Sequence, residues 1–290
     1  MRAFVTVALA GLAVAVAPSC SSKRSERKRA APSDPAGERS PAVLELTAAT
    51  RLGKPLVTLD PPLVARIRAR PEVLGVVPRL ALRAPAQGAF TLGDKEVRIE
   101  VVCDGIDPDL VKERQPGFRD WGAGPAADAP NRCNEAADCP AELYCDERDG
   151  RCHHRVPILI SPTLLELYSA QYAPDHDLPP IDPARFDAAA YRESPLRIEL
   201  GRSMVTGVVK SKGPEPFAVE GQLVGVDPHA MAIGMTVPLG YVQRWNGALL
   251  STTAPAGYTS LEVTLRPRAS SAGLRRWAES LGLRADQLER

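Results

Sequence analysis

The sequence predicts an α+β fold, because segments with the period of a strand and a segment with the period of a helix both occur along it. Apolar and polar residues alternate over 97–101, 196–200 and 260–265, as they do in strands with one face toward solvent. Apolar residues within 274–281 recur instead at the i, i+3, i+4 and i+7 positions of an amphipathic helix. One chain is therefore expected to hold both kinds of element.

Helix starts are marked by a capping residue followed by proline. The pairs are Asp60-Pro61, Asp107-Pro108, Ser161-Pro162 and Asp182-Pro183. The Asp or Ser side chain accepts hydrogen bonds from free amides of the first turn, and proline fits the first helical position without losing a bond. Gly105-Ile106-Asp107-Pro108 and Gly225-Val226-Asp227-Pro228 each follow an apolar strand, and each is expected to form a glycine turn that leads into a capped helical turn.

The composition excludes several classes of protein. The 290 residues are 44% hydrophobic and 24% charged, which is ordinary for a globular chain and excludes a wholly disordered chain or a polytopic membrane protein. Lys and Arg number 36 against 35 Asp and Glu, so the formal charge is +1. No strong positive field attracts nucleic acid, and we expect no nucleic-acid partner.

The N-terminus reads as a targeting segment. Met1-Arg2 precedes an apolar run over 3–17, which is short for a membrane span and typical of an export signal. Ala17-Pro18-Ser19-Cys20 resembles the lipobox of bacterial lipoproteins, which makes Cys20 a candidate lipidation site, although Pro18 departs from that pattern. An uncleaved anchor is the alternative, favoured by the basic run 23–29, because positive charge resists translocation. Residues 1–20 are thus a signal or anchor segment, and 21–42 form a flexible tether.

Four cysteines indicate a small stapled segment. Residues 119–155 are rich in Gly, Pro and Asp, show no strand or helix period, and contain Cys133, Cys139, Cys145 and Cys152. In an exported protein such a coreless stretch indicates two disulfides, for which sequence leaves three pairings open. A zinc site that also uses His153-His154 is the rival, but its spacing and compartment do not fit. Cys103 is left over and is expected to be a small buried residue.

Catalytic and cofactor sites are not predicted. The sequence contains no nucleophile elbow, no phosphate-binding glycine loop and no paired metal-binding histidines of the zinc-protease kind. His176 and His229 are the histidines considered for chemistry, and neither has a partner that the sequence identifies. We therefore predict no catalytic residue, no metal ligand and no cofactor, which makes a non-enzymatic role the expectation.

Three short stretches resemble the MacB-type periplasmic core domain of ABC-transporter permeases, the class that includes MacB, LolC/LolE and FtsX-like proteins. These are Leu74-Gly75-Val76-Val77-Pro78-Arg79, the segment 101–108, and Leu223-Val224-Gly225-Val226-Asp227-Pro228. Residues 61–70 match the opening helix of that domain and 258–283 match its returning strand–helix unit. The resemblance covers about 43–290.

The resemblance implies two subdomains. A βαβ-rich porter-like module would be formed by both chain ends, 43–118 and 254–290, and a strand-rich module, 156–253, would be inserted into it. The cysteine-rich stretch 119–155 is a further insertion outside the usual pattern. Family permeases carry one membrane helix before this domain and three after it. This sequence shows no later apolar run of that length up to residue 290, so it is expected to be a free-standing tethered version or an incomplete permease.

The resemblance also implies a role. Domains of this class do no chemistry and transmit motion between ATPase-driven membrane helices and a periplasmic partner or cargo. We therefore expect an extracytoplasmic, membrane-anchored domain on the periplasmic face of the cell envelope that acts by protein–protein contact in export or envelope assembly. Its expected partners are ABC-transporter membrane or ATPase components and periplasmic proteins. The alternative is a stand-alone secreted lipoprotein with a disulfide-stapled binding module, and a periplasmic hydrolase is a third class.

Overall fold

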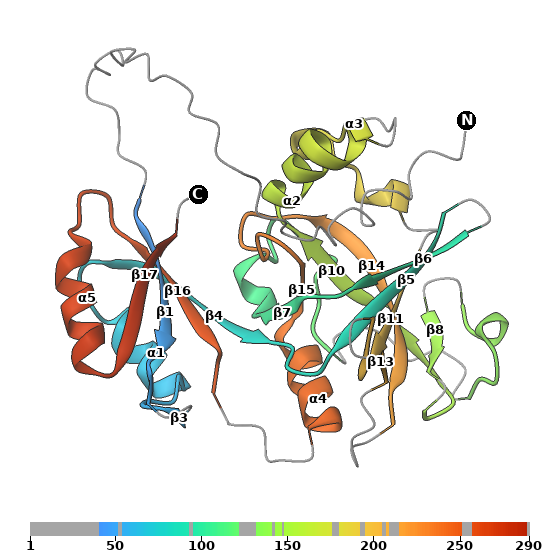
Figure 1. Cartoon of the computed structure of the whole chain (residues 1–290), viewed down its shortest axis with the longest axis horizontal. Coiled ribbons are helices and arrows are strands. Elements are labelled where there is room, and N and C mark those ends of the chain that lie inside the picture. Colours follow the sequence, from blue (N-terminus) through green and yellow to red (C-terminus); the bar gives the residue numbers. More distant parts are fainter. Residues whose placement is uncertain are drawn as a thin grey trace.

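A large mixed sheet organises the chain (Figure 1). The computed structural model describes residues 41–51, 54–92, 95–121, 132–140, 143–146, 148–175, 180–191, 195–204, 207–208, 215–250 and 257–288. Within them, eleven strands follow the order β17-β1-β16-β4-β7-β15-β10-β14-β11-β5-β6. The α+β fold class predicted from the sequence is confirmed.

The bounds of the elements are as follows. The strands of the large sheet are β1 Val43–Ala48, β4 Val73–Ala81, β5 Ala86–Leu92, β6 Lys95–Glu100, β7 Cys103–Ile106, β10 Val156–Ile160, β11 Leu196–Leu200, β14 Phe217–Val226, β15 Met235–Pro238, β16 Ser260–Leu265 and β17 Leu283–Leu288. Short two-stranded pairs are β2 Thr50–Arg51 with β3 Lys54–Pro55, β8 Leu143–Asp146 with β9 Arg151–His154, and β12 Arg202–Ser203 with β13 Gly207–Val208. The α-helices are α1 Pro61–Arg68, α2 Pro162–Leu167, α3 Ala173–Asp175, α4 Leu239–Leu249 and α5 Ser271–Ser280.

The predicted helix starts form as the capping residues indicate. The Asp60 carboxylate accepts a hydrogen bond from the backbone N–H of Leu63 at 2.9 Å, and the Ser161 hydroxyl accepts one from Leu164 at 3.0 Å. Asp107 and Asp182 cap 3-10 turns in the same way. Local capping chemistry therefore decides where these turns begin.

The two chain ends build one compact unit, which we call the terminal unit and which comprises β1, α1, β4, β16, α5 and β17. Its strands lie in the order β17-β1-β16-β4, and all neighbours are antiparallel. β1 and β4 are thus parallel with β16 between them, which is the split β-α-β arrangement of ferredoxin-like folds. Helices α1 and α5 cover one face of the four strands, and the core between them includes Leu44, Leu46, Leu63, Ile67, Val73, Val76, Leu261, Val263, Leu265, Leu274, Ala278 and Leu283.

The residues between β4 and β16 form what we call the inserted unit, 82–257. Its sheet mixes parallel pairs, β7 with β15 and β10 with β14, with antiparallel ones. The largest core lies here, and its fully buried side chains include Ile158, Leu165, Ile198 and Trp245. Both units share one continuous sheet because the end of β4 leaves β16 and pairs with β7.

Apolar residues within 43–118 divide between the two cores. Leu44 to Val76 pack in the terminal unit, whereas Leu80, Ala86, Val101 and Cys103 pack in the inserted unit. The chain thus passes from the core of the terminal unit to that of the inserted unit within β4. This point lies upstream of the boundary at residue 118 that the resemblance implies. Strands β17 and β6 form the two opposite edges of the sheet. The division of the chain into subdomains with those boundaries stays a prediction.

Two local expectations were wrong. The cysteine-rich stretch was expected to lack strands, but β8 and β9 form an antiparallel hairpin there. Gly105 and Gly225 lie inside β7 and β14 instead of in turns. In the case of Gly105, helix α4 packs directly against the strand, and an added Cβ would lie 2.9 Å from Cγ2 of Val242, so glycine permits the close approach.

Among the residues that the structure describes, no helix is both long enough and apolar enough to cross a membrane.

Candidate functional site

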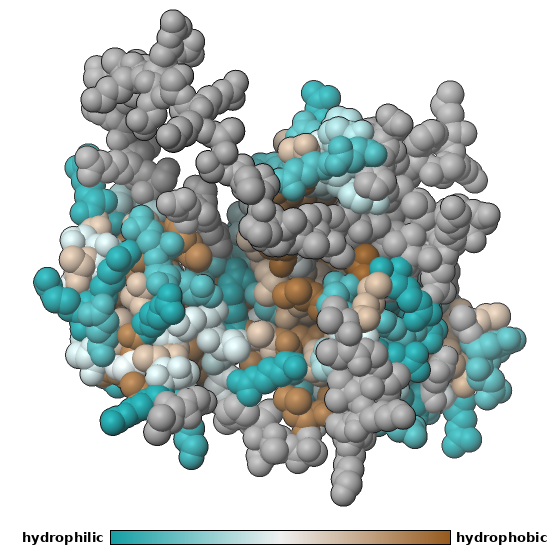
Figure 2. All heavy atoms as spheres, viewed as in Figure 1, coloured by the Kyte–Doolittle hydropathy of each residue, from teal (hydrophilic) through white to brown (hydrophobic). Residues whose placement is uncertain are grey.

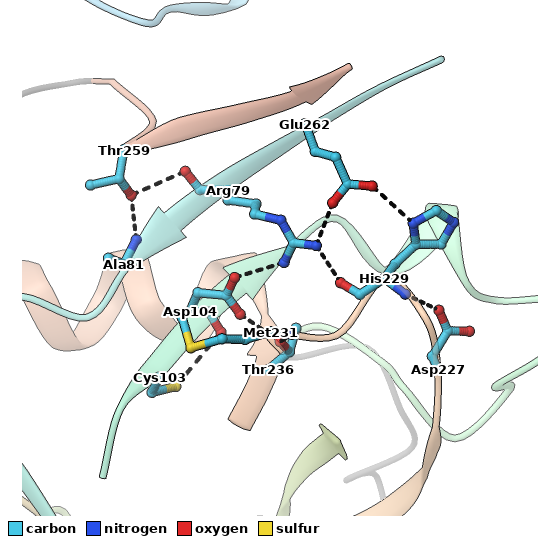
Figure 3. Close-up of polar contacts among 10 residues, drawn as sticks. All are labelled: Arg79, Ala81, Cys103, Asp104, Asp227, His229, Met231, Thr236, Thr259 and Glu262. Atoms are coloured by element: carbon cyan, nitrogen blue, oxygen red, sulfur yellow. Dashed lines mark hydrogen bonds and ion pairs between the residues drawn. The ribbon is translucent and has the colours of Figure 1, made fainter. Parts of the chain in front are cut away.

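A buried arginine lies where the two units meet. Arg79, on β4, donates from Nη1 to Oδ2 of Asp104 on β7 at 2.7 Å and from Nη2 to Oε2 of Glu262 on β16 at 2.8 Å (Figure 3). Nη2 also donates to the backbone oxygen of His229 at 2.5 Å. One guanidinium therefore connects β16 of the terminal unit with β7 and the 227–231 turn of the inserted unit. We call Arg79, Asp104, His229, Thr236 and Glu262 the junction cluster.

Both carboxylates of the junction cluster are almost fully removed from solvent. Only 4% of the Asp104 side chain and 2% of the Glu262 side chain are exposed. Oδ1 of Asp104 accepts a further hydrogen bond of 2.5 Å from the Thr236 hydroxyl on β15. The guanidinium is the natural partner for two carboxylates, because its fixed array of donors can serve both at once.

The electrostatics of the cluster follow from burial. Burial opposes the charged form of Arg79, but the two neighbouring carboxylates outweigh it and raise the pKa of the guanidinium. Burial raises the pKa of Asp104 above its ordinary value, only partly offset by Arg79 and Thr236, and the nearby Glu262 charge adds to the rise. Two carboxylates thus share one cation in a dry site, which makes ionisation of Asp104 less favourable than in water.

The sequence-selected His229 belongs to the turn that closes the cluster. Its backbone N–H donates to Oδ1 of Asp227 at 2.8 Å, and Nδ1 of its ring lies 3.6 Å from Oε1 of Glu262. Asp227 is itself held by Arg114, whose Nε lies 2.9 Å from Oδ2. The histidine therefore contributes its backbone to a structural junction, and its ring lies beside the Glu262 carboxylate.

Side chains also bind the backbone of β4 where it changes neighbour. The Thr259 hydroxyl accepts a hydrogen bond of 2.5 Å from the N–H of Ala81 and donates one of 3.1 Å to the oxygen of Arg79. The Asn246 amide of α4 donates to the oxygen of Ala81 at 3.0 Å and accepts from the N–H of Arg83 at 2.9 Å. The backbone groups of β4 at the point where it leaves β16 and begins to pair with β7 thus keep hydrogen-bond partners. These bonds fix the geometry of β4 at that point.

Buried carboxylates in the described part of the chain are all paired with arginine. These carboxylates belong to Asp104, Asp146, Glu199, Asp227 and Glu262. A general acid or base needs a titratable group that reaches substrate with a pKa near the working pH. Carboxylates that are buried against an arginine have that arginine, and not a substrate, as their partner. The junction cluster can lock two units together, and its geometry does not favour acid–base chemistry.

The four clustered cysteines form two disulfides, as the sequence predicts. Cys133 pairs with Cys145, and Cys139 pairs with Cys152. Cys103 is buried at the first position of β7, and burial raises the pKa of its thiol well above the ordinary value. The sulfur atoms of Cys133, Cys139, Cys145 and Cys152 are therefore joined in disulfides and do not form the alternative zinc site.

The stapled hairpin packs on the rest of the inserted unit through aromatic contacts. The ring of His153 stacks on that of Trp121 with centroids 5.1 Å apart, and the Arg244 guanidinium of α4 lies 4.3 Å from the centroid of Trp121. Tyr144 of β8 is buried in the core of the inserted unit. The hairpin is thus part of a packed body and not a detached loop.

Two further sequence-selected residues, Cys20 and His176, lie outside the described residues. Conversely, sequence reasoning missed Arg79, Asp104 and Glu262. The alternation over 260–265 predicts that Glu262 faces solvent, whereas its side chain is buried, and Arg79 is the last residue of one of the motifs that carry the family resemblance. The available signal was a single charged residue flanked by apolar ones in each strand, but this pattern is shared by many exposed strand residues.

Comparisons with known proteins give structural neighbours only. No family model matches the chain, and no curated protein matches it. The periplasmic region of MacB from Actinobacillus actinomycetemcomitans is similar with a TM-score of 0.35, 11% identity, and coverage of 84% of this chain and 87% of that one. A domain of a putative permease from Porphyromonas gingivalis is similar with a TM-score of 0.34 and 14% identity, and the match covers 87% of this chain and 90% of that one. The extracellular domain of the ABC-type transporter YknZ from Gram-positive bacteria is similar with a TM-score of 0.34 and 10% identity, and the match covers 84% of this chain and 99% of that one. The first and third of these structures are a periplasmic region and an extracellular domain of transporters, and the second is a domain of a putative permease.

Proposed function

We propose that this chain is a non-enzymatic extracytoplasmic domain, tethered at its N-terminus, that acts by protein–protein contact in an ABC-type export or envelope assembly. The observation that carries the proposal is the closure of one split β-α-β unit by the two chain ends around a large inserted unit, with the junction cluster fixing one to the other. A body of this kind transmits a displacement applied at one unit to the other, because its two parts share a sheet and a buried ion cluster.

Two features support an extracytoplasmic location. Two disulfides staple the 133–152 segment, and such bonds persist in oxidising compartments. The apolar run at 3–17 followed by Cys20 has the composition of an export signal. Together they favour a domain that is exported and held at the envelope.

The pairing of buried carboxylates supports a non-enzymatic role. Asp104 and Glu262 are occupied by Arg79, and Asp146 is occupied by Arg148. Their charges are used within the protein and are not directed at a substrate. The exposed surface is then the part of the domain that would act, through contact with other proteins. On one face this surface includes apolar side chains gathered near α4 (Figure 2).

Purification from native membranes tests the proposal. The full chain, tagged and solubilised, is expected to be recovered with a stoichiometric ABC-type ATPase or permease component, and its addition is expected to change the ATPase rate of that component. Glu262→Gln, which weakens the junction cluster, should reduce the change in rate, whereas Lys112→Ala in an exposed ion pair should not. Recovery without any transporter component, and no change in ATPase rate, would contradict the proposal and favour the stand-alone binding lipoprotein.

The form of the tether needs its own test. Cys20→Ala should abolish lipid labelling and leave the chain as precursor or release it, if Cys20 is the acylated N-terminus. Unchanged membrane association, together with no lipid label in the parent chain, would show an uncleaved anchor instead.

A further inference from the structure

Strand β17 is an open edge of the large sheet. It pairs with β1 in a regular register over Leu283–Leu288, and within the described residues no strand lies on its other side. Six residues without proline or a bulge leave a row of outward backbone groups, which is a template for one more strand.

The ladder shows which backbone groups point outward. The N–H of Ala49 donates to the oxygen of Gly282 at 2.9 Å, at the end of the register that pairs β1 with β17. Hydrogen-bonded positions alternate along an antiparallel strand, so the peptide groups of 284, 286 and 288 face β1. Those of Leu283, Ala285 and Gln287 face away from β1 and are the groups that a further strand would use.

The side chains beside these groups carry opposite charges. Arg284 and Asp286 are exposed and lie on the sheet face that helices α1 and α5 leave uncovered, because Leu283 packs in the core on the helix-covered face. Within the chain, Nε of Arg284 lies 2.9 Å from Oδ2 of Asp286. Arg284 and Asp286 therefore lie one residue to either side of Ala285 and carry opposite charges.

We propose that a second copy of this chain binds along β17, antiparallel, with the two-fold axis at Ala285. Arg284 of each copy then lies opposite Asp286 of the other, and Leu283, Ala285 and Gln287 exchange backbone hydrogen bonds across the axis. Opposite charges facing each other across antiparallel strands stabilise the pair. A two-fold axis one residue earlier would place Arg284 opposite itself, and one residue later Asp286 opposite itself, so charge selects this register.

An acidic row on the same face adds to the argument. Glu45 of β1 lies directly opposite Glu262 on one side and Asp286 on the other. Three carboxylates across three adjacent strands repel one another, and the cations within the chain lie at the two ends of the row, Arg79 beside Glu262 and Arg284 beside Asp286. The second copy's Arg284 extends the row with a cation beside Asp286. The surface around α5 and β17 is mainly polar in Figure 2, which suits association through charge and backbone hydrogen bonds.

Cysteine cross-linking reads out both the contact and its register. Arg284→Cys and Asp286→Cys chains, each of full length, are mixed and oxidised, and we expect a disulfide-linked dimer from the mixture only. Directly opposite residues of a non-hydrogen-bonded pair have Cα atoms about 4.5 Å apart, within reach of a disulfide. Cys103 does not compete because it is buried, and Cys20 is changed to Ala in every chain of this experiment. Ser280→Cys, exposed at the last residue of α5 and outside β17, is the matched control.

Charge exchange tests the same contact without cysteine. Arg284→Asp should raise the dimer dissociation constant by at least about tenfold, because both cross-strand pairs become repulsive, and the double variant with Asp286→Arg should restore it. Sedimentation of the full chain measures association, and thermal unfolding shows whether the fold itself changed.

Two kinds of outcome would overturn the proposal. A disulfide-linked dimer formed by the Arg284→Cys chain alone, by the Asp286→Cys chain alone, or equally well by the Ser280→Cys chain overturns the proposed register. A parent chain that remains monomeric at high concentration, with no cross-link in the mixture, overturns the contact itself.

Discussion

Nη2 of Arg79 lies 2.8 Å from Oε2 of Glu262, although the two residues are 183 positions apart in the sequence. The contact joins β4, which ends the N-terminal part of the terminal unit, to β16, which begins its C-terminal part. The same guanidinium binds Asp104 of the inserted unit at 2.7 Å. The position of the inserted unit relative to the terminal unit is therefore coupled to the closure of the terminal unit itself.

Removal of the shared cation should be strongly destabilising. Arg79→Met leaves Asp104 and Glu262 buried without their counter-ion, and we expect the free energy of unfolding to fall by about 3–5 kcal/mol. Lys112→Ala, in an ion pair whose side chains are 62% and 78% exposed, should change it by less than about 1 kcal/mol. Denaturant unfolding measures both, and equal effects would contradict a buried, solvent-excluded junction.

The raised pKa of Asp104 should contribute to the pH dependence of the free energy of unfolding. Its folded pKa is raised above the ordinary value of 3.8, so between these two values the folded chain binds more protons than the unfolded one. The contribution of the protonated form to stability is complete below pH 3.8 and is lost as the pH rises through the folded pKa. Asp104→Asn should therefore show a smaller loss of stability over that window than the parent chain. A steeper loss in the variant would show that the pKa of Asp104 is lowered instead.

Alanine substitutions at two glycines distinguish the effect of close packing on stability from the effect of helix propensity. Gly105→Ala places a Cβ 2.9 Å from Cγ2 of Val242 and 3.0 Å from the Cα of Leu239, so α4 must shift, and we expect a loss of about 1–3 kcal/mol. Gly247 lies within α4 with open space where an alanine Cβ would lie, and Gly247→Ala should stabilise by about 0.5–1 kcal/mol. Thermal unfolding compares the two, and a neutral Gly105→Ala would show that α4 is not held against β7.

Reduction of the disulfides should loosen the hairpin before the sheet. The pairs Cys133–Cys145 and Cys139–Cys152 join residues 12 and 13 positions apart, and each bond is worth about 2–3 kcal/mol to the hairpin. Amide exchange after reduction should rise over 132–154 and stay slow in β10, β14 and β16, which have their own apolar cores. Cys103→Ala keeps both disulfides and serves as control. Loss of protection throughout the sheet would show that the hairpin holds the main core together.

Local features of the fold could be predicted from the sequence because they depend on neighbouring residues. The caps at Asp60 and Ser161, the strand over 260–265 and the helix around Leu274 each follow from residue types within a turn or two. Two disulfides in the 133–152 segment followed from cysteine spacing and the export signal. None of these needs knowledge of what lies across the sheet.

Only the tertiary structure decided which distant residues meet. An alternating strand presents Glu262 to one side whether that side faces water or a buried arginine, so its sequence pattern is the same in both cases. The passage of β4 from one core to the other and the place of β17 at the sheet edge likewise depend on strand order. The choice among three disulfide pairings depends on where Cys133 and Cys139 lie against the β8–β9 hairpin. The physical reason is that periodicity and capping record local geometry, whereas the burial and pairing of a charge are set by segments that folding brings together from far along the chain.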